Sequence, residues 1–525
     1  MAEETEVSMA LLPVLVEPEK GSSLPVHETE EKSMQQKLVT MAKEYDIDDK
    51  KGLLTGNAHA SKEERMRTCD LPDAEKSALE ELKNLVREAL DQNQFSFVVS
   101  GVSLAAPELP ATVAEVKSEA IKADSVENQE APLWREESEE DGTRTVEAIK
   151  ESIIAIPSLT IPYQDKATDP PEEERNLGDT KPEQLETVSI WGVPLLLDER
   201  SDVILLKFLR AREFDARDAF VMIRDTIKWR KEFGIDELIN EDLSCGVDFG
   251  KVVFMDGHDK DGHPVCYNVY GEFQDKELYH NVLSDEEKRH EFLRWRIQFL
   301  EKSIRKLDFT PGGVSTILQV NDLKDSPGLL KRELRQATRQ ALQILQDNYP
   351  EFLAKQVFIN VPWWHLAFYK IISPFLTQRT KSKFVFSGPS RSAETLYRFI
   401  NAGQIPVKYG GLSKHSRFGA DDAITDVIIK PASKHTIEIP INKDGVLVWE
   451  LRVTGSDVKY GAEFAPSAPD SYTVIIQKPR KIEEPVICDS FKTSEHGKVI
   501  FTIENATTKK KILLYRFKTS YPTCS

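Results

Sequence analysis

The sequence predicts a multidomain protein in which an α/β domain, preceded by a helical subdomain, is followed by an all-β sandwich. Three observations support this prediction. Strand-like and helical patterns alternate between residues 251 and 386, as they do in α/β domains with a mainly parallel sheet. Strand patterns without helical ones follow that stretch. The first 183 residues are rich in Glu, Lys, Ser and Pro and poor in aromatic residues, so most of this acidic N-terminal third is expected to be disordered.

Composition narrows the range of functions. A net charge of -18 over 525 residues argues against a nucleic-acid-binding protein, which would carry a basic surface. The five cysteines form no C-x-x-C pair, so neither a zinc site nor a disulfide framework is expected. The N-terminus is acidic where a secretory signal is basic, and no apolar run reaches the roughly 18 residues of a membrane span. We therefore expect a cytoplasmic protein that is soluble or peripherally bound to membranes.

One segment of the N-terminal third differs from its surroundings. Within residues 73–95, Leu79, Leu82, Val86 and Leu90 recur at helical spacing, which predicts an amphipathic helix. Acidic residues crowd its polar face, so docking on the folded part or on a partner is favoured over membrane insertion.

A helical subdomain is predicted over residues 184–240. Ser201 or Asp202 is expected to cap its first helix, and Asp215 a second helix that ends at Gly234.

The α/β domain is predicted over residues 241–415. The turn at 259–262 is expected to join its first two strands as a hairpin. Ser284 has the spacing of a capping box and opens a helix, and residues 329–348 form another. The five strands are expected at residues 251–255, 264–267, 316–320, 357–361 and 383–386.

The sandwich is predicted over residues 422–520, because short alternating strands separated by turns are typical of that architecture. Its strands are expected at residues 436–441, 447–453, 458–464, 472–477, 499–503 and 512–517.

The helix between Trp364 and Leu376 is apolar on nearly every side, which is more than packing on one face requires. A core helix and a movable apolar wall are both compatible with this pattern.

The candidate motifs for catalysis and for metal binding are incomplete or missing. Residues 246–251 are one residue short of a phosphate-binding loop, and residues 259–262 lack the flanking ligands of a calcium loop. Neither G-x-S-x-G nor H-E-x-x-H occurs. We expect no enzyme activity, no metal and no cofactor.

Two basic groups are candidates for contact with anionic membranes. One is a stripe of arginines at helical spacing, and the other lies in a predicted hairpin turn, where each lysine would contribute about 1 kcal/mol. An ordinary solvated surface explains either group equally simply. The six residues are Arg332, Arg335, Arg339, Lys509, Lys510 and Lys511.

Several motifs occur together in a fixed order. They are LRAREFD at 209–215, YPE at 349–351, NVP at 360–362, PFL at 374–376 and YGG at 409–411. In this order they resemble the CRAL-TRIO lipid-binding domain. The sandwich is similar to a GOLD domain, and the acidic N-terminus, CRAL-TRIO and GOLD together resemble the plant patellins.

This resemblance implies a non-enzymatic protein that binds phosphoinositides or phosphatidylinositol and transfers lipid. It also implies a peripheral membrane protein of trafficking that acts in cell-plate formation during cytokinesis, at the cell plate or the plasma membrane. The implied partners are phosphoinositides, anionic membranes, and trafficking proteins bound through GOLD and the N-terminal region. The phospholipid is a ligand rather than a cofactor.

The resemblance also implies site residues. Arg212, Glu351, Thr380 and Lys383 match the residues that hold inositol phosphate in the related yeast phosphatidylinositol transfer protein, where Glu213 is replaced by lysine. Two of them can donate to phosphate and two can bond inositol hydroxyls. The apolar helix resembles the gate over the lipid pocket. Its gate residues are Trp364, Phe368, Ile371, Ile372, Phe375 and Leu376.

Two other functions remain open. One is a trafficking adaptor that uses GOLD and the acidic N-terminus while its lipid pocket is vestigial. The other is a carrier of a different hydrophobic ligand, such as a tocopherol or a sterol, because an apolar wall does not choose between them.

Overall fold

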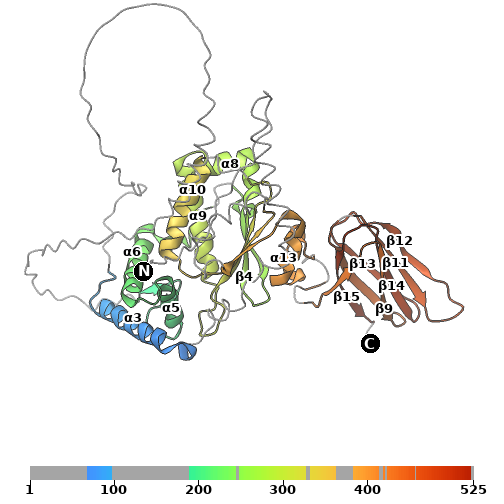
Figure 1. Ribbon diagram of the computed structural model, residues 1–525, viewed down its shortest axis with the longest axis horizontal. Helices are drawn as coiled ribbons and strands as arrows, with labels where there is room; N and C mark the ends of the chain where they lie inside the picture. The colour runs from blue at the N-terminus through green and yellow to red at the C-terminus, as the bar shows by residue number, and fades with distance from the viewer. Residues whose placement is uncertain are drawn as a thin grey trace, which may run out of the picture. The chain divides into compact units, whose positions relative to one another are not determined.

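The computed structural model shows a helical subdomain, an α/β layer and a β-sandwich (Figure 1), which confirms the predicted fold class. Most of the predicted disordered region lies outside the residues that the structure describes. The structure describes residues 68–96, 188–243, 247–326, 332–361, 382–412, 418–419, 422–455 and 457–521.

The helical subdomain begins with a short hairpin and continues through three helices. Asp215 caps α6 as predicted, because its Oδ1 accepts hydrogen bonds from Arg217 N and Asp218 N, each at 2.9 Å. Gly234, with φ 68°, ends the same helix. The elements are β1 (Ser189–Ile190), β2 (Val193–Pro194), α5 (Arg200–Ala211), α6 (Ala216–Phe233) and α7 (Ile235–Leu238).

The predicted caps of α5 are wrong. This helix begins at Arg200 after Glu199, which makes no side-chain cap bond. Ser201 instead donates from its hydroxyl to the carbonyl oxygen of Pro194 at 2.8 Å. Asp202 faces a different helix, so neither side chain is available for the helix end.

That helix is α3 (Asp73–Asp91), which confirms the predicted amphipathic segment. Leu82 and Val86 are fully buried against α5 and α6, and Lys83 Nζ lies 2.9 Å from the Asp202 carboxylate. Phe95, just beyond the helix, packs its ring on Phe220. The helix therefore docks on the chain's own helical subdomain, although about 90 residues of sequence separate the two.

The five-stranded sheet has the order β3-β4-β5-β6-β7. The first pair is antiparallel, as the predicted hairpin requires, and the other pairs are parallel. Val320 and Val357 on one face of the sheet pack against Leu396 and Ile400, and all four are fully buried. Helices α9 (Glu286–Ile304) and α10 (Arg332–Asn348) lie on the other side of the sheet from α13 (Ser392–Phe399) (Figure 1). The strands are β3 (Val253–His258), β4 (Pro264–Val269), β5 (Ile317–Asp322), β6 (Leu353–Ile359) and β7 (Phe384–Phe386).

The N-terminal cap of α9 in the α/β domain is not the predicted residue. Asp285, not Ser284, caps α9, because Asp285 Oδ1 accepts from Lys288 N at 2.9 Å. The Ser284 hydroxyl supports this cap by donating to Asp285 Oδ2. An additional helix, α8, precedes α9. The helices are α8 (Lys276–Leu283), α9 (Glu286–Ile304), α10 (Arg332–Asn348) and α13 (Ser392–Phe399).

Short 3-10 turns occur along the described chain. They are Thr68–Asp70, Phe249–Lys251, Tyr270–Gln274, Pro389–Arg391, Ala402–Gln404 and Val407–Tyr409.

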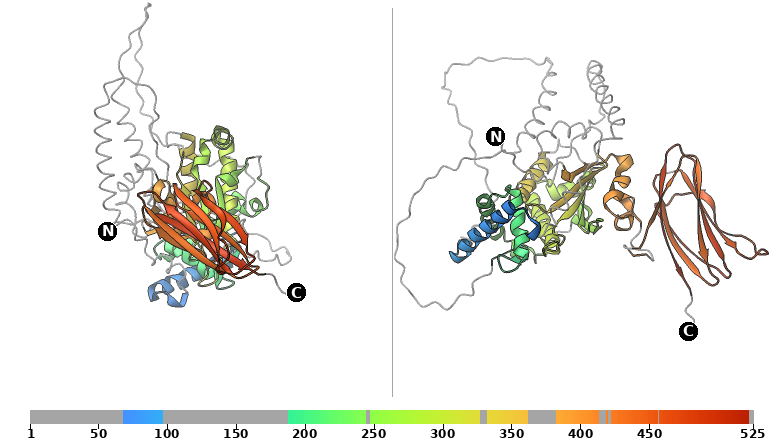
Figure 2. Two further views of the ribbon diagram at one scale, coloured as in Figure 1. Left: turned by 90° about the vertical axis from the view of Figure 1, so that its right-hand side faces the viewer. Right: turned by 60° about the horizontal axis from the view of Figure 1, so that its bottom comes forward.

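The C-terminal region is a sandwich of two four-stranded antiparallel sheets, β13-β10-β15-β8 and β12-β11-β14-β9 (Figure 2). Trp449, Tyr460 and Phe501 are almost fully buried between them, and Trp449 Nε1 donates to the Tyr460 hydroxyl at 3.0 Å. Strands β8 and β13 were not predicted. The strands are β8 (Thr425–Ile429), β9 (Ser433–Ile441), β10 (Val446–Val453), β11 (Val458–Pro466), β12 (Val474–Lys481), β13 (Ile487–Lys492), β14 (Gly497–Asn505) and β15 (Lys511–Ser520).

The lysine-rich turn is not a hairpin, because it joins β14 in one sheet to β15 in the other. Asn505, which is fully buried, holds this connection by donating from Nδ2 to the carbonyl oxygens of Lys430 and Lys509, at 3.0 and 2.9 Å. Lys509 and Lys510 are exposed, whereas Lys511 is partly covered where β15 begins.

Candidate functional site

Glu351 and Lys383, two of the predicted head-group residues, lie next to each other. Glu351 follows α10 in the left-handed region, with φ 54°, just before β6. Lys383 immediately precedes β7, the parallel neighbour of β6. The Lys383 Nζ atom lies 2.7 Å from Glu351 Oε2, and the two side chains are 13% and 9% exposed. The sheet therefore brings together two charges that are 32 residues apart in the sequence.

The other two predicted head-group residues are not joined to this pair. Arg212 is the C-cap residue after α5, is exposed, and donates from Nη1 to the carbonyl oxygen of Ala211 at 3.0 Å. Glu213 and Phe214 follow with φ 50° and 64°, which turns the chain sharply after Arg212. Thr380 lies outside the described residues.

Lys207 is a further residue of this site, and the sequence analysis missed it. It is 2% exposed, and its Nζ donates to the carbonyl oxygens of Ser315 and Glu351, at 2.9 and 2.8 Å. The same ammonium group lies 4.4 Å from the centre of the Phe352 ring. One signal could have revealed it, since a lysine inside the apolar run 203–209 needs buried acceptors.

The residues before Glu351 are fastened by a buried charge pair. Arg230 of α6 binds both carboxylate oxygens of Glu301 on α9, at 2.6 and 3.0 Å. The Tyr349 hydroxyl donates to Glu301 Oε1 at 2.7 Å. Burial raises the pKa of Tyr349 well above its ordinary value, and the Glu301 charge adds to this effect. Tyr349 therefore ties the segment that carries Glu351 to two helices.

A cavity of about 50 Å³ lies beside the segment that carries Glu351. It is bordered by α9, α10 and the sheet, and its wall is mainly apolar, with Phe299, Leu300 and Phe352 among the residues that line it. Arg296 is the charged residue in the wall. On this measure one water molecule needs roughly 10–15 Å³, so the cavity holds only a few water molecules and is too small for an acyl chain as it stands.

The predicted gate lies outside the described residues, as do the side chains of the arginine stripe, although α10 itself includes all three arginines. The gate residues concerned are Trp364, Phe368, Ile371, Ile372, Phe375 and Leu376. The stripe residues are Arg332, Arg335 and Arg339.

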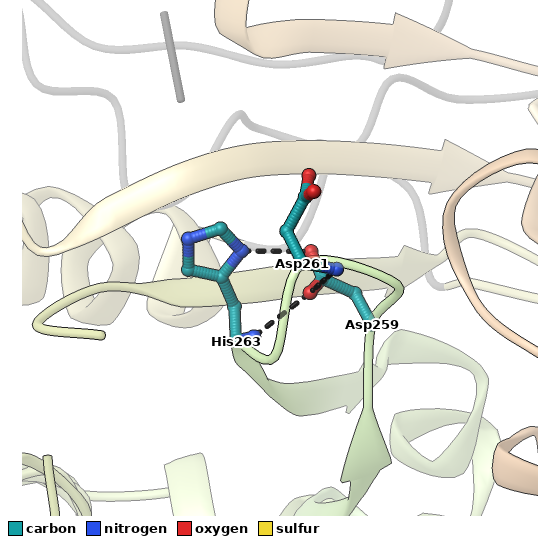
Figure 3. Close-up of side chains that lie close together, drawn as sticks. All are labelled: Asp259, Asp261 and His263. Atoms are coloured by element: carbon teal, nitrogen blue, oxygen red, sulfur yellow. Dashed lines mark hydrogen bonds and ion pairs between the residues drawn. The ribbon is translucent and has the colours of Figure 1, made fainter. Parts of the chain in front are cut away.

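Asp259, Asp261 and His263 gather in the β3–β4 turn, with potential metal-ligand atoms within 4.8 Å of one another (Figure 3). Asp259 Oδ1 accepts hydrogen bonds from Asp261 N and His263 N, at 2.9 and 2.8 Å. Asp259 Oδ2 lies 2.9 Å from His263 Nδ1, and His263 is 2% exposed. Both carboxylate oxygens of Asp259 already bind groups of the turn, so a structural role in the predicted hairpin accounts for this cluster.

Within the described part of the chain, no helix combines the length and the apolar character that crossing a bilayer requires.

Comparison with known proteins identifies the domains. Residues 168–225 match the CRAL/TRIO N-terminal domain, residues 248–411 the CRAL/TRIO domain, and residues 430–511 the Patellin-1-like C-terminal GOLD domain. Patellin-3 of Arabidopsis thaliana is 50% identical over 90% of this chain and 80% of its own length. Patellin-5 of the same plant is 60% identical over 64% of this chain and 51% of its own length.

A more distant relative is the phosphatidylinositol transfer protein SFH5 of Scheffersomyces stipitis, which is 31% identical over 53% of this chain and 89% of its own length. The fold and the matched domains thus define a CRAL-TRIO protein with a C-terminal GOLD domain. Within that class, the chain belongs to the patellin family. This membership agrees with the prediction that the chain is not an enzyme.

Proposed function

We propose that this chain is a phosphoinositide- or phosphatidylinositol-binding protein that takes lipid from membranes and presents or transfers it. The observation that carries the proposal is the largely covered ion pair between Glu351 and Lys383, at 2.7 Å. A relative is named as a phosphatidylinositol transfer protein, which supports the same lipid class.

The pair suits an inositol phosphate head group chemically. Lys383 can donate to a phosphate oxygen, and the Glu351 carboxylate can accept hydrogen bonds from inositol hydroxyls. Without lipid the two charges neutralise each other, so neither is left buried and unpaired. In this proposal Arg212 and Thr380 complete the head-group site, with Arg212 reaching from the end of α5.

The acyl chains need space that the 50 Å³ cavity does not provide. Burial of each methylene group of the lipid contributes about 0.8 kcal/mol. This energy favours moving an apolar wall aside so that the acyl chains can enter and be covered. We assign that role to the helix Trp364 to Leu376. The function then includes peripheral membrane association, with contacts from Arg332, Arg335, Arg339 and the turn at 509–511, and a trafficking role that extends to the cell plate in cytokinesis.

Lipid uptake by the full chain tests this proposal. The protein is incubated with vesicles that contain labelled phosphatidylinositol, re-isolated, and its bound lipid is counted. Combining Lys383→Ala with Glu351→Lys removes the pairing, and uptake should fall by roughly 10- to 100-fold, because hydrogen bonds to charged groups are worth about 1.5–3 kcal/mol.

A matched control exists in the sandwich. Lys498 and Glu438 form an exposed ion pair at 2.8 Å, so Lys498→Ala with Glu438→Lys makes the same chemical change elsewhere and should leave uptake unaltered. Unchanged uptake by the Lys383 and Glu351 variant would refute the head-group assignment. Absence of any lipid uptake by the unmodified chain would favour the adaptor function, which the small cavity also supports.

A further inference from the structure

A cation with no counter-ion among the described residues lies in the wall of the cavity between the sheet and helices α9 and α10. Arg296 of α9 lines this cavity beside Cys266 and Gln319 of the sheet. Its Nη1 atom is buried and makes no hydrogen bond within the described residues. Its Nη2 atom lies 3.5 Å from Asn268 Oδ1, which is long for a hydrogen bond. The guanidinium carbon lies 5.4 Å from the centre of the Phe299 ring.

Two other arginines, one within α9 and one at its C-terminal end, are matched with acids. Arg294 forms an ion pair with Glu241, and Arg305 forms one with Asp236 at 3.2 Å. Arg296 has no such pair in the part of the chain that the structure describes. A charge placed in an apolar cavity loses its hydration, and that loss is large unless an opposite charge replaces the water.

The neighbouring undescribed segments cannot supply that opposite charge. Between residues 188 and 412 these segments are 244–246, 327–331 and 362–381, and their sequences contain neither Asp nor Glu. The undescribed side chains of α10 contain no acid either. A counter-ion for Arg296 therefore does not come from this stretch of the chain.

We propose that Arg296 binds the anionic group of an acidic amphiphile, a phosphate or a carboxylate attached to an apolar chain, inside the cavity. The inference rests on the proposed function, because it assumes that this cavity opens to take lipid. It adds an interior anion subsite to the head-group pair Glu351–Lys383. Gln319 adds a polar group to the cavity wall and Asn268 lies beside the guanidinium group, while Phe299 and Phe352 line the apolar part of the cavity.

Two probes that differ in charge and by a single methyl group test the subsite on the full chain. The fluorescent fatty acid cis-parinaric acid carries a carboxylate, and its methyl ester does not. The unmodified protein should bind the acid more tightly by roughly 10- to 100-fold. Arg296→Met should abolish that preference, and Arg296→Lys, which keeps the charge, should retain part of it. Equal binding of both probes by the unmodified protein, or an undiminished preference in Arg296→Met, would overturn the proposal.

Thermal unfolding without ligand separates binding from a structural role. Replacing an unpaired cation by methionine, which has a similar length, should leave the melting temperature unchanged or raise it. A large drop in both Arg296→Met and Arg296→Gln would assign Arg296 to stability and overturn the proposal.

Displacement of parinaric acid identifies the anion. Lysophosphatidic acid is compared with monoacylglycerol for phosphate, and oleic acid with oleyl alcohol for carboxylate. Stronger displacement by the charged member of a pair supports the subsite and shows whether it binds phosphate or carboxylate. If neither charged member displaces the probe more strongly, the proposal is contradicted. Phosphatidylinositol uptake is measured on the same samples. Normal uptake without any acid preference defeats this inference alone, whereas loss of uptake in the unmodified chain defeats the proposed function as well.

Discussion

Lys207 fixes the position of Glu351, because its buried ammonium group donates a hydrogen bond to the Glu351 carbonyl oxygen at 2.8 Å. The same nitrogen reaches Ser315 O, at the start of β5, at 2.9 Å. A helix of the N-terminal subdomain thus fixes the backbone at Glu351, the proposed head-group ligand. Helical subdomain and sheet therefore act together in positioning the site.

Lys207→Met should destabilise the fold by about 2–4 kcal/mol, because two buried carbonyl oxygens lose a charged donor. Urea unfolding followed by tryptophan fluorescence measures the change. Lys228→Met on α6 is the control, since Lys228 is 54% exposed and should change stability by less than about 0.5 kcal/mol. Equal effects of the two substitutions would contradict the role of Lys207.

Glu301→Gln should cost about 3–5 kcal/mol, because it leaves Arg230 charged and unpaired in a buried site. Tyr349→Phe removes a single hydrogen bond to the same carboxylate and should cost about 1–2 kcal/mol. A double-mutant cycle by chemical denaturation measures their coupling. Glu291→Gln, at an exposed position of the same helix, is the control. Additive effects of the two substitutions would show that Tyr349 and Glu301 do not act as one unit.

Motif order and periodicity were sufficient to predict the fold class and a mainly parallel sheet. The predicted caps failed at Ser201, Asp202 and Ser284, since a cap depends on where the neighbouring backbone runs. Asp202, for example, is drawn to Lys83 of a helix distant in sequence.

Contacts between distant segments account for the rest of what the sequence did not reveal. Lys207 and Glu301 resemble ordinary helix residues until the sheet places acceptors and an arginine beside them. Arg296 likewise gives no signal in the sequence, because only the packing of α9 on β4 and β5 shows that none of the described acids pairs with it. The Glu351–Lys383 pair was expected from family resemblance, but its direct contact follows from β6 and β7 being neighbours.

The thiol of Cys488 should resist alkylation over an unusually wide pH range. Although Cys488 is exposed at the surface, partial desolvation of its thiol raises the pKa to about 12, and Glu450, which accepts from Sγ at 3.3 Å, adds to the shift. An unfolded cysteine has a pKa of about 8.5, so the protonated thiol stabilises the fold fully below that pH. This contribution is lost as pH rises toward 12.

Mass spectrometry of the peptide that contains Cys488 measures this property. The rate of its reaction with iodoacetamide should still be rising beyond about pH 10, because the thiolate is the nucleophile. A plateau near about pH 9 would show an ordinary thiol pKa.

Exchanging Lys509, Lys510 and Lys511 for Gln should weaken binding to vesicles that contain anionic lipid. Each lysine near the surface contributes about 1 kcal/mol, and the difference should shrink as salt is added. Co-sedimentation with and without anionic lipid measures the effect. Lys434, Lys443 and Lys478 in the same domain, exchanged for Gln together, provide a charge-matched control. Full binding by the first variant would exclude the turn from membrane contact.

The lipid that co-purifies with the full chain from cells tests the central claim most directly. Mass spectrometry of the extracted lipid should show phosphatidylinositol or a phosphoinositide, enriched over its share of the cell membranes. The variant that combines Lys383→Ala with Glu351→Lys should lose that enrichment, and the Lys498→Ala with Glu438→Lys control should keep it. A sterol or a tocopherol in place of the inositol lipid, or no bound lipid in the unmodified protein, would contradict the account.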